Sequence, residues 1–297
     1  MKNKGLIITL IIALSILAIS LLGVMFLFIS GKMSRPTLFK ITKVSTTKIL
    51  DEKYDTKFKN VKVDTGTSDI YIRKSNDEQI RVVVYGEKKE LKVEDNSEEL
   101  SIHFEEKNCI GICFNMTKNK VEVYLPENYQ EKIMIKNNYG DIRIDSFKNA
   151  TIEVEEDCGD VSIASGKRIM VKNDYGDIKI GEAKFANLKE SCGDIEVGKV
   201  NDIIVKNNYG NIEIKKVLNY IDAKEDCGDI EIENLHINKN STIKNSFGSI
   251  DIENTNDIYI DAKTDLGDVD IKRNSHTAKI ALTIRNNCGD ITVEDDK

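Results

Sequence analysis

The sequence has 297 residues, of which 40% are hydrophobic, 31% charged and 6% aromatic, with no tryptophan. That length allows one large domain or two small ones, and the apolar content excludes a wholly disordered chain. Seven of the 43 lysines and arginines, and none of the 50 acidic residues, lie in residues 1–50, so residues 51–297 hold 36 bases and a net charge of −14. Such an acidic part argues against nucleic acid as a partner, because its binding needs cations to neutralise phosphates.

A five-residue tail, residues 1–5, precedes an uncharged apolar run at residues 6–29. At about 1.5 Å per residue this run is long enough to cross the roughly 30 Å hydrocarbon core of a bilayer. We therefore expect one N-terminal transmembrane α-helix at 6–29. A cleaved signal peptide is the alternative, although its apolar region is usually shorter and no clear cleavage site follows here.

Residues 30–56 are expected to be a basic juxtamembrane linker, and they bear on orientation. Their cations favour a cytoplasmic β domain by the positive-inside rule, whereas a minimal tail before a long apolar helix is typical of an uncleaved signal anchor. We favour the second interpretation. It predicts a single-pass protein of the cytoplasmic membrane with its β domain extracellular, and a cytoplasmic β domain is the alternative.

Residues 57–130 are expected to form the N-terminal strands or cap of a larger β structure. The stretch VKVDTGTSDIYI at 61–72 is a degenerate copy of the repeat described next, and alternating runs follow between residues 80 and 125. Cys109 and Cys113 lie close enough in sequence to form a disulfide if the segment turns, and this pairing stays open.

Residues 131–297 repeat one short phrase, of which NNYGDIRI and EDCGDIEI are examples. The glycines recur every 17–22 residues, and isoleucine or valine stands two and four residues after each of them. This alternation is typical of a strand with one buried face. The motif glycines are Gly140, Gly159, Gly176, Gly193, Gly210, Gly228, Gly248, Gly267 and Gly289.

A second apolar position five residues before each glycine predicts another strand, with Gly-Asp as the corner between the two. One such unit cannot bury its apolar face alone, so stacking is expected. The predicted fold class is all-β, a β-helix or solenoid of about nine to ten repeats, preceded by the transmembrane helix. The residue before glycine alternates between Tyr and Cys, so one coil holds either one repeat, which we favour, or two.

The anchor, the segment VEVYLPENY at 121–129 and the tandem Gly-Asp repeats together resemble the bacterial putative-adhesin family of unknown function. The resemblance covers about residues 58–295. It implies a membrane-anchored β-helical module of the cell envelope with a role in adhesion, binding or envelope-stress sensing, and it supplies no catalytic residues. The sequence therefore favours a non-catalytic binding module without cofactor or metal, and a β-helical carbohydrate-active enzyme is the alternative.

Carboxylates recur three residues after the glycine on five successive repeats, beside the aspartate of Gly-Asp, while lysine or arginine recurs four residues before it. Stacked like charges destabilise a sheet, so we predict that these carboxylates bind cations, cationic envelope peptides or another envelope protein. A solvated face is the alternative, and the aspartates are also expected to cap backbone N–H groups at the corner. The candidate residues, here called the acidic stripe, are Asp194, Glu196, Glu213, Asp229, Glu231, Asp251, Asp268 and Asp270.

Overall fold

The structure is a computed structural model that describes residues 43–55, 57–87, 91–104 and 117–294. The expected transmembrane helix at 6–29 and the Cys109–Cys113 pair lie outside these residues. Within them every regular element is a β-strand, and none of the described segments is a helix able to cross a membrane. The described residues belong to one compact unit.

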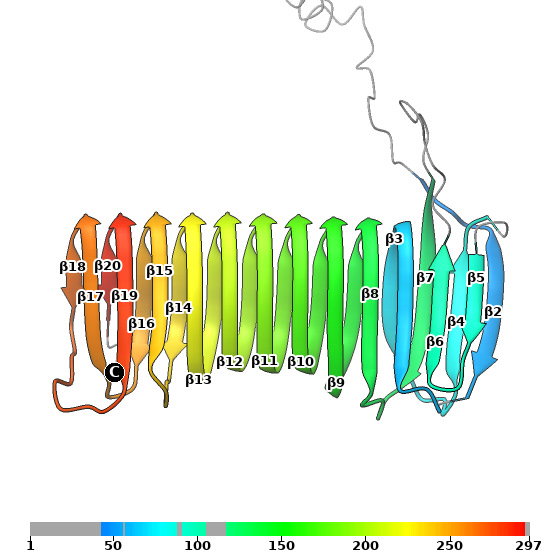
Figure 1. The fold of residues 1–297 in the computed structure, drawn as a ribbon, viewed down its shortest axis with the longest axis horizontal. Helices are drawn as coiled ribbons and strands as arrows, with labels where there is room; N and C mark the ends of the chain where they lie inside the picture. Colours follow the sequence, from blue (N-terminus) through cyan, green and yellow to red (C-terminus); the bar gives the residue numbers. More distant parts are fainter. Residues whose placement is uncertain (1–42, 56, 88–90, 105–116, 295–297) are drawn as a thin grey trace, which may run out of the picture. The chain divides into compact units, whose positions relative to one another are not determined.

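The repeats form a parallel β-solenoid in which each turn has two strand layers joined at the Gly-Asp corner (Figure 1). The strands of the solenoid are β3 (Asn60–Ser75), β8 (Lys132–Tyr139), β9 (Ile142–Cys158), β10 (Val161–Tyr175), β11 (Ile178–Cys192), β12 (Ile195–Tyr209), β13 (Ile212–Cys227), β14 (Ile230–Leu235), β15 (Ser241–Phe247), β16 (Ile250–Thr255), β17 (Tyr259–Leu266), β18 (Val269–Ile271), β19 (Ala281–Cys288) and β20 (Ile291–Val293). Strands β9 to β13 run through the far bend of a turn without interruption.

One repeat makes one turn. Val161 of β10 aligns with Ile142 of β9 on one side and with Ile178 of β11 on the other, so residues at the same repeat position lie side by side. This register confirms the favoured interpretation of the sequence. Every surface and core feature of the solenoid is therefore a column that contains one residue from each turn.

The apolar columns fill the interior, as the alternation predicts. Ile178, Ile195 and Ile212 are fully buried on successive turns, and each such side chain stabilises the fold by about 1.5–3 kcal/mol. Val269 is the exception to this burial, because its side chain is 42% exposed. Strand β18 is the outermost of its layer, so no further turn covers that residue.

Glycine is required at the corner for two reasons, which Gly193 illustrates. Its φ is 159°, and a Cβ at this position would lie 2.0 Å from the carbonyl oxygen of Gly176 on the preceding turn. The amide of Gly193 donates to the carbonyl of Tyr209 at 2.9 Å. A side chain would therefore separate turns that the backbone hydrogen bonds hold together.

The aspartate at most Gly-Asp corners caps the adjacent turn, as expected from the sequence. Oδ1 of Asp177 accepts from the amide of Asp194 at 2.9 Å, and Oδ1 of Asp194 accepts from the amide of Asn211 at 2.7 Å. Asp69 does the same for Asp141 at 3.1 Å, although Ser68 replaces the glycine in that first copy. The carboxylates thus satisfy donors that the corner leaves outside the strand pairing.

An inner polar column, which was not predicted, lies three residues before the corner glycines. Asparagine and glutamate alternate there over most of the stack, and Glu190 is only 3% exposed. Nδ2 of Asn173 donates to the carbonyl of Gly159 at 3.1 Å. The buried members of the column are Asn137, Glu156, Asn173, Glu190, Asn207, Glu225, Asn245 and Asn286.

Burial raises the pKa of the glutamates in this column, to about 8 for Glu156 and to about 7 for Glu190 and Glu225. Oε2 of Glu190 and Oδ1 of Asn173, on neighbouring turns, both lack a hydrogen-bond partner among the described residues. A proton on Glu190 would let Oε2 donate to Oδ1. The neutral acid therefore fits this site better than the carboxylate does.

The last two turns are stacked in the reverse of their chain order. Strands β19 and β20 pair with β15 and β16 on one side and with β17 and β18 on the other, so the final repeat is inserted between the two before it (Figure 1). The amide of Gly248 donates to Cys288 at 3.0 Å, and that of Gly289 to Leu266 at 2.8 Å. In space the large and small residues before glycine then alternate without a break, as Phe247, Cys288 and Leu266.

The N-terminal strands extend the stack beyond β3. Strand β3 pairs in parallel with β6 along its first half and with β7 along its second, while β2, β4 and β5 add antiparallel pairs. Short strand β1 pairs with β7. Their bounds are β1 (Lys43–Val44), β2 (Lys48–Tyr54), β4 (Ile80–Tyr85), β5 (Leu91–Asp95), β6 (Glu99–Phe104) and β7 (Thr117–Pro126).

The raised pKa values predict that stability falls as pH rises. Because the folded-state pKa values of Glu190 and Glu225 lie above the ordinary 4.5, the folded chain holds extra protons between about pH 4.5 and 7. Their contribution is complete below pH 4.5 and is lost as pH rises through 7, by about 1.4 kcal/mol per unit of pKa shift. We expect the free energy of unfolding of the double variant Glu190→Gln with Glu225→Gln, measured with denaturant, to change less between pH 5 and 8.5 than that of the native chain. Identical pH dependences would contradict this assignment.

The aspartate caps predict a position-dependent cost of substitution. Asp194→Ala leaves the Asn211 amide without its acceptor and should lower the free energy of unfolding by about 1 kcal/mol. Asp268 is the matched control, because it lies on the outermost turn and its carboxylate accepts no hydrogen bond from another described residue. Thermal unfolding should therefore be unchanged in Asp268→Ala. Equal losses in the two variants would show that the cap is not the stabilising contact.

Candidate functional site

The acidic stripe lies on the outer face of the strand layer that follows the Gly-Asp corner. Glu196, Glu213, Glu231 and Asp251 lie directly side by side on four successive turns, about 4.8 Å apart. The expected run of five is wrong at its end. Thr292 lies between Asp251 and Asp270, because the final repeat is inserted there.

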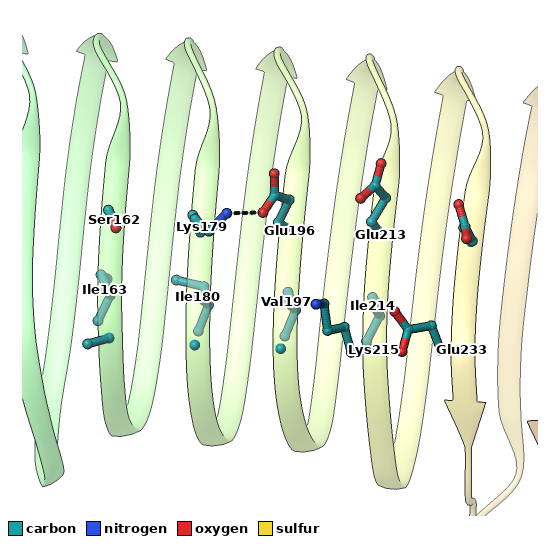
Figure 2. A pocket seen from close by; sticks show the side chains of 14 residues that line it. Ser162, Ile163, Lys179, Ile180, Glu196, Val197, Glu213, Ile214, Lys215 and Glu233 are labelled. Atoms are coloured by element: carbon teal, nitrogen blue, oxygen red, sulfur yellow. Dashed lines mark hydrogen bonds and ion pairs between the residues drawn. The ribbon is translucent and has the colours of Figure 1, made fainter.

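A shallow groove of about 340 Å³ lies along the central part of this stripe. Figure 2 shows Lys179, Glu196 and Glu213 in a row along it, with Lys215 and Glu233 on a second row. The second row contains Ala164, Gly181 and Gly198 on the preceding turns, and these small residues leave the space that longer side chains fill elsewhere. The groove therefore has a carboxylate-rich wall and a bottom formed largely by backbone.

The charges along the groove are unevenly neutralised. Nζ of Lys179 forms an ion pair and hydrogen bond with Glu196, which raises the pKa of that lysine. Glu213, Glu231 and Asp251 are exposed and form no ion pair within the described part of the chain. Asp270, beyond Thr292, pairs with Lys272 at 2.5 Å. The uncompensated negative charge is therefore concentrated on three adjacent turns.

Two aspartates of the predicted stripe, Asp194 and Asp229, have a structural role that the glutamates lack. Oδ1 of Asp229 accepts from the amide of Ser249 at 2.7 Å, as Asp194 does from Asn211. Only their second carboxylate oxygens face solvent without this constraint. Asp268, at the end of the stack, is the corner aspartate of the stripe whose two oxygens both accept no hydrogen bond from described residues.

Sequence reasoning missed the groove itself. Its position depends on Gly181 and Gly198, five residues after their corner glycines, where other repeats carry Lys215 and Glu233. Two successive glycines at one outward position were the available signal. They are also tightly placed, since a Cβ on Gly198 would lie 2.5 Å from the carbonyl oxygen of Gly181.

The repeated cysteines do not form a metal site or a disulfide with one another. Cys158, Cys192, Cys227 and Cys288 are free and partly exposed. Each lies two turns from the next, about 9.6 Å away, which is beyond the Cα separation of about 7 Å that a disulfide spans. Among the described residues no group of three histidine, cysteine or acidic side chains is placed to hold a metal ion.

Three solved structures are similar to most of the chain at low sequence identity. A "putative adhesin" from Bacteroides fragilis has 16% identity and a TM-score of 0.42, and covers 85% of this chain and 99% of its own. A "putative adhesin" from Parabacteroides merdae has 11% identity and a TM-score of 0.44, and covers 86% and 99%. A "putative lipid binding protein" from Parabacteroides distasonis has 13% identity and a TM-score of 0.40, and covers 85% and 99%.

No curated protein matches the sequence significantly. The family is instead given by two matches to one family model, which together include strands β3 to β20 and all the Gly-Asp repeats. Residues 58–189 and residues 186–297 each match the model described as Toastrack DUF4097, so this chain belongs to the Toastrack DUF4097 family.

Proposed function

We propose that the chain is a membrane-anchored, non-catalytic binding module of the cell envelope, and that the acidic stripe is its ligand face. The observation that carries this proposal is the row formed by Glu213, Glu231 and Asp251, whose carboxylates are adjacent, exposed and without ion-pair partners among the described residues. A row of this kind offers several equivalent contacts along one line. It suits adhesion to an extended ligand better than chemistry at one point.

The ligand is a cation for electrostatic reasons. Adjacent carboxylates about 4.8 Å apart repel one another, which destabilises the sheet by some tenths of a kcal/mol per pair. A bound cation removes that cost and is attracted by the summed negative field. Divalent cations and the lysine or arginine side chains of a cationic peptide, free or on another envelope protein, have the required charge, and the groove beside Glu213 has room for side chains.

Anchoring and location are part of the same proposal. The apolar residues 6–29 are long enough to span a bilayer, and the proposed orientation places the β domain outside the cytoplasmic membrane. Cationic envelope peptides would then reach the acidic stripe without crossing the membrane.

The binding proposal predicts salt-dependent capture of a cationic peptide. The full chain should bind an oligolysine peptide at low ionic strength, and the affinity should fall at least tenfold by about 0.5 M salt, because screening weakens exposed charges. The double variant Glu213→Lys with Glu231→Lys should lose measurable binding in calorimetry. Glu78→Lys with Glu94→Lys, which changes net charge equally at exposed sites elsewhere, should retain it.

Two results would count against this function. Binding that survives both the stripe substitutions and high salt would show that the stripe is only a solvated face. Release of soluble sugar from an envelope polysaccharide by the purified chain would favour the carbohydrate-active enzyme instead.

The anchoring proposal predicts that protease added to intact, wall-stripped cells digests the β domain while a cytoplasmic marker protein stays whole. The physical basis is that a single span at residues 6–29 leaves residues 30–297 on one side of the membrane. Protection until the cells are lysed would reverse the orientation. The cations of residues 30–56 would then lie on the cytoplasmic side of the membrane.

A further inference from the structure

A second charged column runs along the other strand layer of the solenoid, the layer that precedes the Gly-Asp corner. It consists of exposed or partly exposed cationic side chains four residues before the corner glycines from Gly176 to Gly289, in register on seven successive turns. Glu155 holds the same position on the turn next to Lys172, so the column of cations ends there. In spatial order this basic column is Lys172, Lys189, Lys206, Lys224, Lys244, Arg285 and Lys263.

Most of the positive charge in the basic column is not neutralised. Lys224 pairs with Asp226 at 2.9 Å, Arg285 with Asp261 at 2.6 Å and Lys263 with Asp265 at 3.5 Å. The other four members, Lys172, Lys189, Lys206 and Lys244, form no ion pair within the described ranges. Like charges on adjacent strands destabilise a sheet, and the repetition of this cost on turn after turn indicates an anionic ligand.

The basic column is one residue wide. Beside Lys189 and Lys206, the outward neighbours in sequence are the uncharged residues Asn187, Ile204, Ser191 and Asn208. Toward either end the flanking columns become acidic, with Asp174, Asp222, Asp226 and Asp261. The positive field is thus a narrow line parallel to the stack, about 29 Å long for seven turns.

We propose that the basic column binds a linear phosphodiester polymer that lies extended along the stack, with its phosphates on successive lysines. A narrow line of cations matches a chain that carries one anionic group per short repeat. A membrane surface fits worse, because a plane of anionic headgroups would also meet Asp222 and Asp226. Single-stranded nucleic acid fits worse too, because the exposed aromatic side chains on which its bases could stack, Tyr175, Tyr209 and Phe247, lie at the corner and not in the two columns that flank the lysines.

This inference is independent of the acidic stripe, which lies on the other strand layer. The two layers of one turn therefore carry opposite charges, with Glu196 after the corner and Lys189 before it. A polyanion on the basic column leaves the groove beside Glu213 free.

Titration of the full chain, in non-ionic detergent, with polyglycerol phosphate tests the inference. With four unpaired cations in contact, the affinity should fall about 50-fold between about 50 and 200 mM salt, because each neutralised phosphate releases counterions. Lys189→Glu with Lys206→Glu should weaken binding at least tenfold. Both side chains are exposed, so circular dichroism should show an unchanged fold.

A matched control lies on the same central turns. Lys167 and Lys184 are exposed at the far bend and form no ion pair with any described residue, so Lys167→Glu with Lys184→Glu gives the same net charge away from the basic column. The affinity of this variant for the polymer should be within about twofold of that of the native chain. The variant Glu213→Lys with Glu231→Lys should also retain polymer binding, which separates this inference from the proposed function.

Four outcomes would overturn the inference. Equal losses in the Lys167/Lys184 and Lys189/Lys206 variants would show that only net charge matters. Displacement by free inorganic phosphate at comparable phosphate concentrations would indicate a single-anion site. Phosphatidylglycerol vesicles that bind more tightly than the polymer, with the same dependence on Lys189 and Lys206, would identify a membrane surface. A single-stranded oligonucleotide that binds more tightly would identify nucleic acid.

Discussion

Parallel pairing of each turn with its neighbour, in the same register on both sides of the Gly-Asp corner, is the constraint on which the rest of this structure depends. It holds because the corner glycine lets adjacent backbones approach and because the aspartate after it binds the amide of the next turn, as Asp177 does for Asp194. Once that register is set, each repeat position becomes a column. The contribution of one repeat position to stability is then repeated on every turn. This holds for a favourable residue, such as an inward-facing isoleucine, and equally for an unfavourable one.

The same multiplication explains why the outer columns are informative. An isolated exposed lysine or glutamate has little effect on stability and needs no explanation. In this solenoid Lys189 is flanked by Lys172 and Lys206, and Glu213 is flanked by Glu196 and Glu231. Two columns of opposite sign on two strand layers are costly unless anions and cations occupy them, which is why we propose a binding role for each layer.

Much of this fold could be predicted from the sequence because its determinants are local. The β-branched alternation after glycine identified the inward face. The period of the motif indicated a stack, with one repeat per turn as the favoured of two alternatives. The capping role of the aspartates followed from turn chemistry. These features depend on residues that are close in sequence, such as Gly193, Asp194 and Ile195.

The reversed order of the last two turns, the groove and the inner polar column depend on contacts between turns and were not predicted. For the reversal, two signals were present. The spacing from Gly267 to Gly289 is the longest of the repeats, and Leu266 follows Phe247 in the chain where a small residue would continue the alternation. The asparagines and glutamates three residues before glycine were also present in the sequence. Their burial, however, depends on the three-dimensional geometry of the corner. The membrane anchor remains a prediction from residues 6–29 alone.

Measuring the register between turns is the most direct test, because every column depends on that register. Methyl NOE spectroscopy on the isotope-labelled chain measures it at the reversed end, where chain order and spatial order differ. The reversed stacking order predicts cross-peaks from Ile291 to both Ile250 and Val269, because Ile291 lies between them. It predicts no direct cross-peak between Ile250 and Val269. A direct Ile250–Val269 contact, with Ile291 in contact with Val269 alone, would contradict the stacking order and with it the columns built on that order.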